Sequence, residues 1–145
     1  MRLATLLERE ALEALQWRAS LANAGDRAAL LANPDAVAIP ADQIVSNQVV
    51  VAESGGTLVG FAAVIPRADG QAELDALFVD PAVWKCGAGR ALVEECAKMA
   101  RSQGRAFLHV IGNPHAEGFY TACGFERTGT ADTRFGEGLL MRKAL

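Results

Sequence analysis

Residues 77–92 read LFVDPAVWKCGAGRAL, and this stretch carries most of the information about fold and ligand. An apolar, strand-like segment runs to Asp80-Pro81, a glycine-containing turn follows, and apolar residues at helical spacing come next. The first four backbone N–H groups of a helix lack partners within it, and the helix dipole places partial positive charge there. Glycines let a phosphate approach these groups, and Lys85 and Arg90 flank them. The stretch therefore predicts a diphosphate site, with a plain strand-to-helix turn as the alternative.

Two well-known glycine loops are excluded by the spacing. A nucleotide P-loop needs Gly-x-x-x-x-Gly-Lys-Ser/Thr, and the sequence contains no Gly-Lys-Ser/Thr. A dinucleotide fingerprint needs Gly-x-Gly-x-x-Gly after a parallel βαβ start. Gly87 and Gly89 supply two of these glycines, but the third position is Leu92.

The flanking sequence predicts an α/β fold. Turn signals at 55–56 and 69–70 separate three segments rich in strand-forming residues, which indicates an antiparallel meander. The expected strands are 48–53, 57–66, 71–79, 106–111, 125–128 and 138–143. The expected helices are 6–22, 26–32, 41–45, 88–103 and 113–123. The order is helices followed by β-β-β-α-β-α-β-β, so we expect one domain over residues 1–145, a mixed sheet with helices on both faces.

The composition is that of a folded domain. The 145 residues are 51% hydrophobic with a net charge of −3, which excludes an intrinsically disordered chain. No apolar run approaches the roughly 18–20 residues of a membrane-spanning helix, and the N-terminal stretch turns acidic too early for a signal peptide. Cys86, Cys96 and Cys123 form neither a disulfide framework nor a zinc-type Cys-x-x-Cys pair. We therefore expect a cytoplasmic protein with no membrane association and no metal.

The charge is unevenly distributed along the chain. Residues 1–83 carry five basic and eleven acidic side chains, whereas residues 84–145 carry nine basic and six acidic ones. An acidic first half suits a cationic ligand and a basic second half an anionic one, although scatter among solvated charges is the alternative. Neither half is basic enough to indicate a nucleic-acid partner.

A second motif lies at residues 113–125, NPHAEGFYTACGF. It resembles the Asn-x-x-Ala-x-x-Phe-Tyr-x-x-x-Gly-Phe helix of the GNAT superfamily of N-acetyltransferases. The family's loop, Arg/Gln-x-x-Gly-x-Gly/Ala, is matched at Gly87 and Gly89, with Trp84 at its leading position. The resemblance covers about residues 48–145. It implies a GNAT-like mixed, mostly antiparallel sheet flanked by helices, with a very short first strand near residues 2–5 and a bulge in the strand before the loop.

The resemblance also implies acetyl-CoA as the acyl donor. Its pantetheine arm would bond to the backbone of Leu77, Phe78 and Val79, in a gap between that strand and the next. Its pyrophosphate would lie on the N–H groups of Lys85, Cys86, Gly87, Ala88, Gly89 and Arg90. Asn113 would lie near the pantetheine and Tyr120 near the thioester sulfur.

The implied reaction is direct transfer of the acetyl group to an amine in a ternary complex. Tyr120 is the candidate general acid to the leaving sulfur. Glu73 and Asp75 share one strand face and are candidate general bases, or else a pair of solvent-facing charges. The acceptor would be a small-molecule amine or a protein amine, and dimers are common in the family. The alternative function is a non-catalytic acyl-CoA-binding sensor or partner module.

Overall fold

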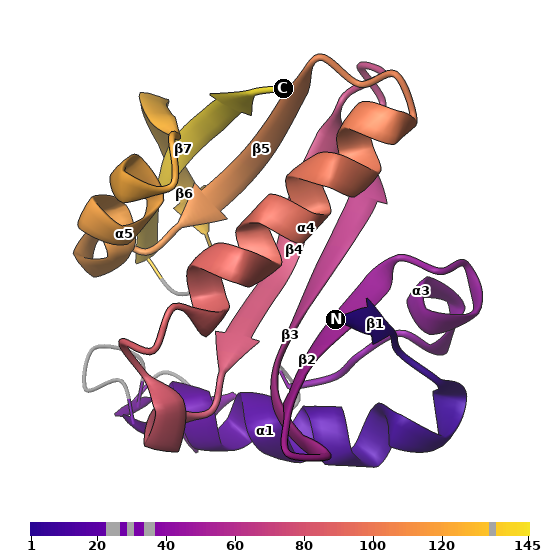
Figure 1. Cartoon of the computed structure of the whole chain (residues 1–145). Helices are drawn as coiled ribbons and strands as arrows, with labels where there is room; N and C mark the ends of the chain where they lie inside the picture. Colours follow the sequence, from indigo (N-terminus) through magenta and orange to yellow (C-terminus); the bar gives the residue numbers. More distant parts are fainter. Residues whose placement is uncertain (23–26, 29–30, 34–36, 134–135) are drawn as a thin grey trace.

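The computed structural model describes residues 1–22, 27–28, 31–33, 37–133 and 136–145. Its strands, all in one sheet, are β1 (Arg2–Leu3), β2 (Val49–Ser54), β3 (Thr57–Pro66), β4 (Ala72–Val79), β5 (Phe107–Gly112), β6 (Glu126–Thr133) and β7 (Gly136–Ala144). Its α-helices are α1 (Arg9–Ala22), α3 (Ala41–Val45), α4 (Ala88–Ser102) and α5 (Glu117–Ala122). Short 3-10 turns are η1 (Leu6–Glu8), η3 (Pro81–Val83) and η4 (Pro114–Ala116). The strand order is β1-β2-β3-β4-β5-β7-β6 (Figure 1).

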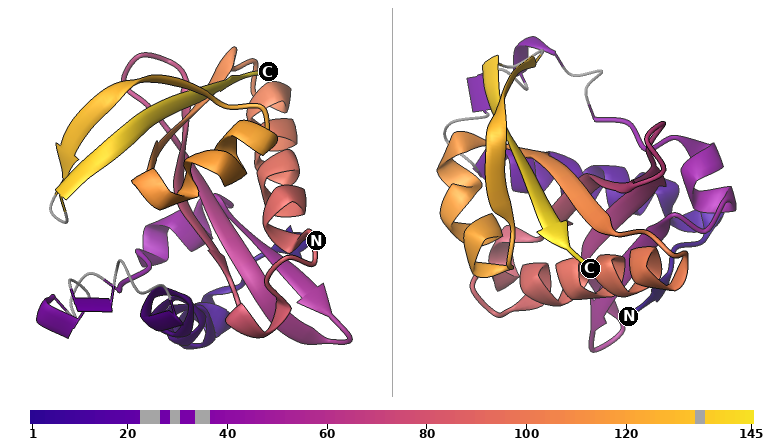
Figure 2. Two further views of the ribbon diagram at one scale, coloured as in Figure 1. Left: turned by 90° about the vertical axis from the view of Figure 1, so that its left-hand side faces the viewer. Right: turned by 90° about the horizontal axis from the view of Figure 1, so that it is seen from above.

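Helices cover both faces of the sheet (Figure 2). On one face, α4 buries an apolar stripe that includes Leu92, Cys96 and Ala100, at the spacing of an amphipathic helix. On the other face, Leu12 and Leu15 of α1 pack with a second set of buried residues. The first four residues of β2 are all apolar because alternate residues face opposite sides of the sheet and contribute to two separate cores.

The predicted antiparallel meander over residues 48–79 is confirmed. β2 pairs with β3 and β3 pairs with β4, both antiparallel. The connecting turns use Gly55, Gly56 and Gly70 in the left-handed region, with φ of 59°, 80° and 85°. Glycine adopts such angles without the steric cost that a Cβ would add. The expected mixed, mostly antiparallel sheet with flanking helices is therefore confirmed.

Two irregularities in β4 shape the site, and the predicted bulge is one of them. The β3 register moves from the pair Ala63–Ala76 to the pair Val64–Leu74, which leaves Asp75 as the extra residue on β4. In addition, β4 pairs in parallel with β5 at only two positions, Ala72–Leu108 and Glu73–His109. Beyond these positions the two strands diverge (Figure 1).

Several predicted boundaries were wrong. The last two strands run over 126–133 and 136–144 rather than 125–128 and 138–143, because backbone pairing continues through polar residues that show no apolar alternation. The predicted helices 6–22 and 113–123 each begin as a 3-10 turn. Of the predicted helix 26–32, residues 27–28 and 31–32 are helical, and residues 26, 29 and 30 lie outside the described residues. No helix in the described part of the chain is long and apolar enough to cross a membrane.

Candidate active site

The free edge of β4 presents backbone groups that pair with no neighbouring strand, at the place where the pantetheine site was predicted. The Asp80 N–H donates to the Val59 carbonyl at 2.8 Å, so the neighbouring pair, Gly60–Val79, is a non-hydrogen-bonded pair of the β3–β4 ladder. The N–H and C=O of Val79, and by alternation those of Leu77, therefore point away from β3. Because β5 has already diverged, these groups lie on an edge without strand pairing.

Phe78 plays a different part from its two neighbours. Its backbone faces β3, where it is paired with Phe61. Its ring lies 5.6 Å from the Phe61 ring, on the α1 face of the sheet. Of the three predicted pantetheine residues, only Leu77 and Val79 thus direct backbone groups to the free edge.

The predicted diphosphate loop holds an open helix N-terminus. Gly87 has a φ of 83° and precedes α4, and no side chain caps the helix. The first-turn N–H groups of Ala88, Gly89 and Arg90 have no partner within the helix, so partial positive charge gathers beside the loop. Lys85 also has a left-handed φ of 68°, a conformation that is uncommon for residues other than glycine.

Two side chains fix the loop that precedes α4. The Trp84 indole N–H donates to the Val79 carbonyl at 2.8 Å, so the residue at the family's Arg/Gln position anchors the loop to the end of β4. The Asp80 carboxylate accepts from the Ala82 N–H at 3.0 Å and from the Arg18 guanidinium at 3.0 Å. These bonds, the Ala82 N–H foremost, lower the pKa of Asp80. Sequence reasoning missed both contacts.

The two family motifs touch each other through small residues. A Cβ at Gly89 would lie 3.2 Å from the Phe119 ring, and a Cβ at Gly112 would lie 2.9 Å from Cε2 of Tyr120. Glycine at both positions therefore lets α5 pack closely against the start of α4 and the end of β5. Asn113 follows Gly112 directly, at the end of β5 that diverges from β4.

Tyr120 is held by aromatic neighbours. The rings of Phe119 and Phe125 meet it edge-on, at centroid distances of 5.2 Å and 5.5 Å. Burial raises the pKa of Tyr120 to about 12. The hydroxyl is therefore protonated at neutral pH and can donate a proton or a hydrogen bond.

Glu73 lies where β4 and β5 part. Its neighbours Ala72 and Leu74 are buried on the α4 face, so alternation directs Glu73 to the α1 face. Burial, followed by the Asp75 charge, raises the pKa of the half-buried Glu73, with Arg67 opposing. Tyr120, by contrast, packs against the core on the α4 face. The candidate acid and base thus lie on opposite faces of the sheet.

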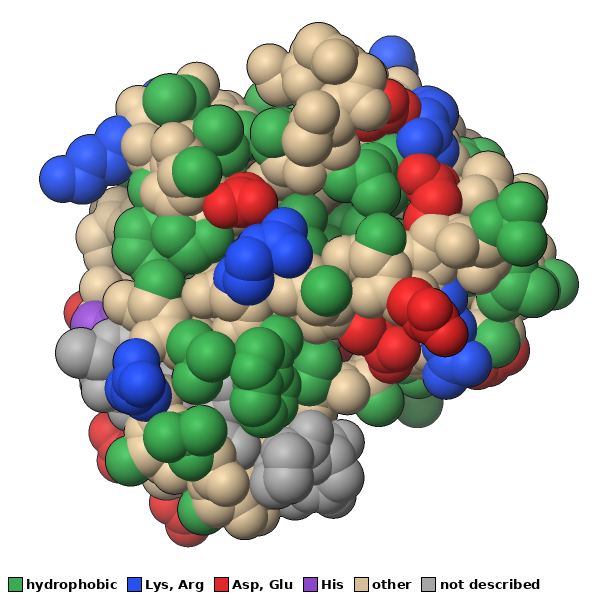
Figure 3. Space-filling view, turned by 90° about the horizontal axis from the view of Figure 1, so that it is seen from below, with side chains coloured by type: hydrophobic (Ala, Val, Ile, Leu, Met, Phe, Trp, Pro, Cys, Tyr) green, Lys and Arg blue, Asp and Glu red, His purple; other side chains and the backbone are tan. Residues whose placement is uncertain are grey.

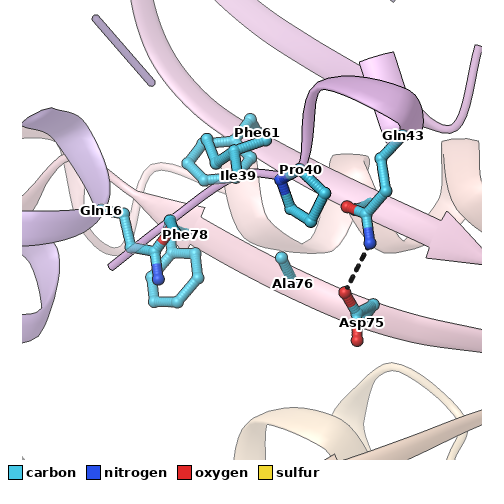
Figure 4. Close-up of a pocket in the computed structure, with 10 residues that line it drawn as sticks. Gln16, Ile39, Pro40, Gln43, Phe61, Asp75, Ala76 and Phe78 are labelled. Carbon is cyan, nitrogen blue, oxygen red and sulfur yellow. Dashed lines mark hydrogen bonds between the residues drawn. The ribbon is translucent and has the colours of Figure 1, made fainter. Parts of the chain in front are cut away.

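Asp75 lines a pocket of about 190 Å³ on the α1 face. The bulge at Asp75 brings both it and Ala76 to this pocket, together with Phe78. The Asp75 carboxylate accepts a hydrogen bond from Nε2 of Gln43, on α3, at 3.0 Å (Figure 4). Sequence reasoning missed Gln43, because nothing in the local pattern signals that α3 packs beside β4.

No cysteine forms a disulfide in the described part of the chain. All three are free, with Cys86 exposed and Cys96 and Cys123 buried. Burial raises the pKa of Cys96 to about 12, so that thiol is not ionised at neutral pH.

Comparison with known proteins gives the family. The acetyltransferase (GNAT) family matches residues 6–125. A stretch of 59 residues is 42% identical to the peptidyl-lysine N-acetyltransferase YjaB of Escherichia coli K12. That stretch covers 41% of this chain and only 39% of YjaB.

Two of the solved structures that match nearly the whole chain illustrate the similarity. The PaiA N-acetyltransferase of Thermoplasma acidophilum, solved with coenzyme A, aligns with a TM-score of 0.78 at 21% identity over 99% of this chain and 97% of its own. The ribosomal-protein-alanine N-acetyltransferase of Brucella melitensis aligns with a TM-score of 0.74 at 26% identity over 99% and 98%. With the family match spanning most of the sequence, the chain belongs to the GNAT family of acetyltransferases.

Proposed function

We propose that the chain moves an acetyl group from acetyl-CoA to a primary amine, by direct transfer in a ternary complex. The observation that carries this proposal is the unpaired edge of β4, which leads into the uncapped N-terminus of α4. A strand edge can pair with an amide-containing arm, and a helix N-terminus can hold a diphosphate. We propose that residues 1–145 form one domain for this purpose.

The donor would lie along residues of both motifs. Leu77 and Val79 would bond to the amides of its pantetheine arm, with Phe78 supporting the strand from the α1 face. Its diphosphate would rest on the backbone of residues 85–90. Asn113 and Tyr120 would flank it on the side of β5 and α5. Bound acetyl-CoA supplies an activated thioester.

The side chains of the protein would then move the protons. Glu73 would take a proton from the acceptor ammonium, since its raised pKa makes it a better base than an ordinary carboxylate. A backbone N–H on the free edge of β4 would donate to the acyl oxygen as negative charge develops there. Tyr120 would donate its proton to the departing sulfur. Asp75 was the second candidate base, but its bond to Gln43 favours a positioning role, so we assign the base to Glu73.

The acceptor we propose is a primary amine of a small molecule or of a protein. Two relatives favour the second source, because their names describe acetylation of a peptidyl lysine and of a ribosomal-protein alanine. A homodimer and a cytoplasmic location are proposals that come from the resemblance and from the sequence.

The test is release of coenzyme A from acetyl-CoA by the purified protein across a panel of primary amines, with Tyr120→Phe as the comparison. We expect amine-stimulated release in the parent and a severe loss in the variant, at unchanged acetyl-CoA binding. Binding of acetyl-CoA without release for any amine would contradict the proposal and favour a sensor. Absence of acetyl-CoA binding would contradict the cofactor assignment as well.

A further inference from the structure

Most of the residues that line the pocket beside Asp75 are apolar. Ile39 and Pro40 precede α3, Phe61 belongs to β3, and Ala76 and Phe78 belong to β4 (Figure 4). The accessible apolar side chains among them, Pro40, Ala76 and Phe78, can contact a hydrocarbon group, because this contact removes apolar surface from water.

The polar groups of the pocket lie at its two ends. In Figure 4, Gln43 and Asp75 form one end, and Gln16 of α1 lies near Phe78 at the other. The Gln43 amide engages Oδ2 of Asp75 and fixes the carboxylate at that end, while Oδ1 accepts no hydrogen bond from any described residue. Among the described lining residues, Asp75 is the only charged group.

The charge that an acceptor meets in the pocket therefore comes from the nearest residues and not from the wider surface. Seen from the side that carries α1, acidic and basic side chains are interspersed among apolar ones rather than gathered by sign (Figure 3). The Glu73 carboxylate adds to the negative potential near Asp75, since the two charges interact. An ammonium group is favoured here, and a second carboxylate is opposed.

The size of the pocket limits the group that can enter it. Its volume of about 190 Å³ is below the roughly 300–1,000 Å³ typical of sites for drug-sized ligands. An apolar cavity of about 150 Å³ is sufficient to bind benzene. One ring or a short alkyl chain therefore fits within the pocket, whereas an aminoglycoside would extend beyond it.

We propose that the pocket selects a primary amine carried on one short apolar group, with no carboxylate next to the nitrogen. Asp75 holds the ammonium two residues before Leu77, at the start of the free edge, and the accessible side chains of Pro40, Ala76 and Phe78 contact the apolar group. A polyamine is disfavoured because Asp75 is the only charged group among the described lining residues, so a second cation would find no charged partner there. This inference rests on the proposed acetyl transfer. A small amine and a lysine side chain share this chemistry.

The test measures binding of amines to the protein saturated with coenzyme A, by calorimetry, so that it does not depend on turnover. Phenethylamine is compared with phenylalanine, which differs only by a carboxylate next to the nitrogen, and with spermidine. We expect phenethylamine to bind at least about tenfold tighter than phenylalanine. Equal or tighter binding of phenylalanine or spermidine overturns the proposal. The amine could also be carried by a lysine side chain, so a lysine peptide with blocked termini is tested as well. If this peptide competes with phenethylamine for binding, the pocket is assigned to a protein side chain.

Variants separate the pocket from the chemistry. Asp75→Asn should weaken phenethylamine about tenfold in binding and in KM, with kcat changed much less. Asp42→Asn, an exposed carboxylate on the same helix as Gln43, is the matched control and should bind phenethylamine as the parent does. Ala76→Leu should exclude phenethylamine and still admit ethylamine, because it fills the pocket without removing its charge. Unchanged affinity in Asp75→Asn overturns the proposal.

The two proposals fail in different ways. If phenethylamine binds in an Asp75-dependent manner but no amine releases coenzyme A, the acetyl transfer fails and the pocket assignment stands. If amines release coenzyme A and Asp75→Asn leaves KM unchanged, the transfer stands and the pocket assignment fails.

Discussion

Replacing Gly112 with alanine should displace Tyr120 without substituting any reacting group. The new Cβ would lie 2.9 Å from Cε2 and 3.1 Å from Cδ2 of the tyrosine ring. Carbon atoms in contact are most stable at about 3.5–4.0 Å, so the ring must recede by roughly 0.6 Å or more. The backbone cannot give way instead, because Gly112 is paired with Leu139 in the sheet.

The ring also has little room to move. Phe119 and Phe125 meet it edge-on from other sides, so the clash is absorbed by tilting Tyr120 away from its position. A misplacement of about 1 Å at a catalytic group can lower the rate about 100-fold. We therefore expect kcat to fall by about 10- to 100-fold and the free energy of unfolding to fall by about 1–3 kcal/mol.

The assay is steady-state release of coenzyme A, with acetyl-CoA affinity measured by calorimetry and folding by thermal melting. The matched control is Gly118→Ala on α5, where an added Cβ meets nothing within 4 Å and φ is not left-handed. That variant should keep the parent kcat and gain helix stability of about 0.5–1 kcal/mol. A folded Gly112→Ala protein with the parent kcat, or an equal loss in Gly118→Ala, would refute the reasoning.

Three further predictions concern single side chains. Tyr120→Phe should lower kcat by about 100-fold or more in steady-state assays; near-parental turnover would remove the acid role. Because the pKa of Glu73 is raised, its carboxylate destabilises the folded chain as pH rises through that pKa. Glu73→Gln should therefore raise the melting temperature at neutral pH but not below about pH 4.3. It should also abolish the fall of kcat at acidic pH, and a variant that keeps this fall would exclude Glu73 as the base. Trp84→Phe, which loses the bond to Val79, should lower the free energy of unfolding by about 0.5 kcal/mol in denaturant titrations; unchanged stability would show that the bond contributes nothing.

The parts of the fold that follow local rules could be predicted from sequence. Turn glycines and alternating apolar residues located the meander, and the Gly87–Gly89 loop located the start of α4. The length of the β6–β7 hairpin could not be predicted, since its outer part is held by backbone pairing between polar residues. No apolar period marks a strand that does not face the core.

The candidate site also contains residues that the sequence could predict and residues that it could not. Tyr120 and the loop glycines lie in motifs with fixed spacing, and the structure brings those motifs into contact. The pocket depends on the bulge at Asp75, where strict alternation fails and two successive residues reach one face. Gln43 and Phe61 join it from α3 and β3. These neighbours arise from tertiary packing, so no local pattern marks them.

Amide hydrogen exchange along β4 tests most directly whether the free edge of this strand binds the donor. The register makes the expectation specific to single residues. Adding acetyl-CoA should slow exchange at Leu77 and Val79, whose N–H groups point to the free edge, and leave Phe78, already bonded to β3, unchanged. Saturation with acetyl-CoA that slows neither Leu77 nor Val79, or that slows Phe78 equally, would contradict the account.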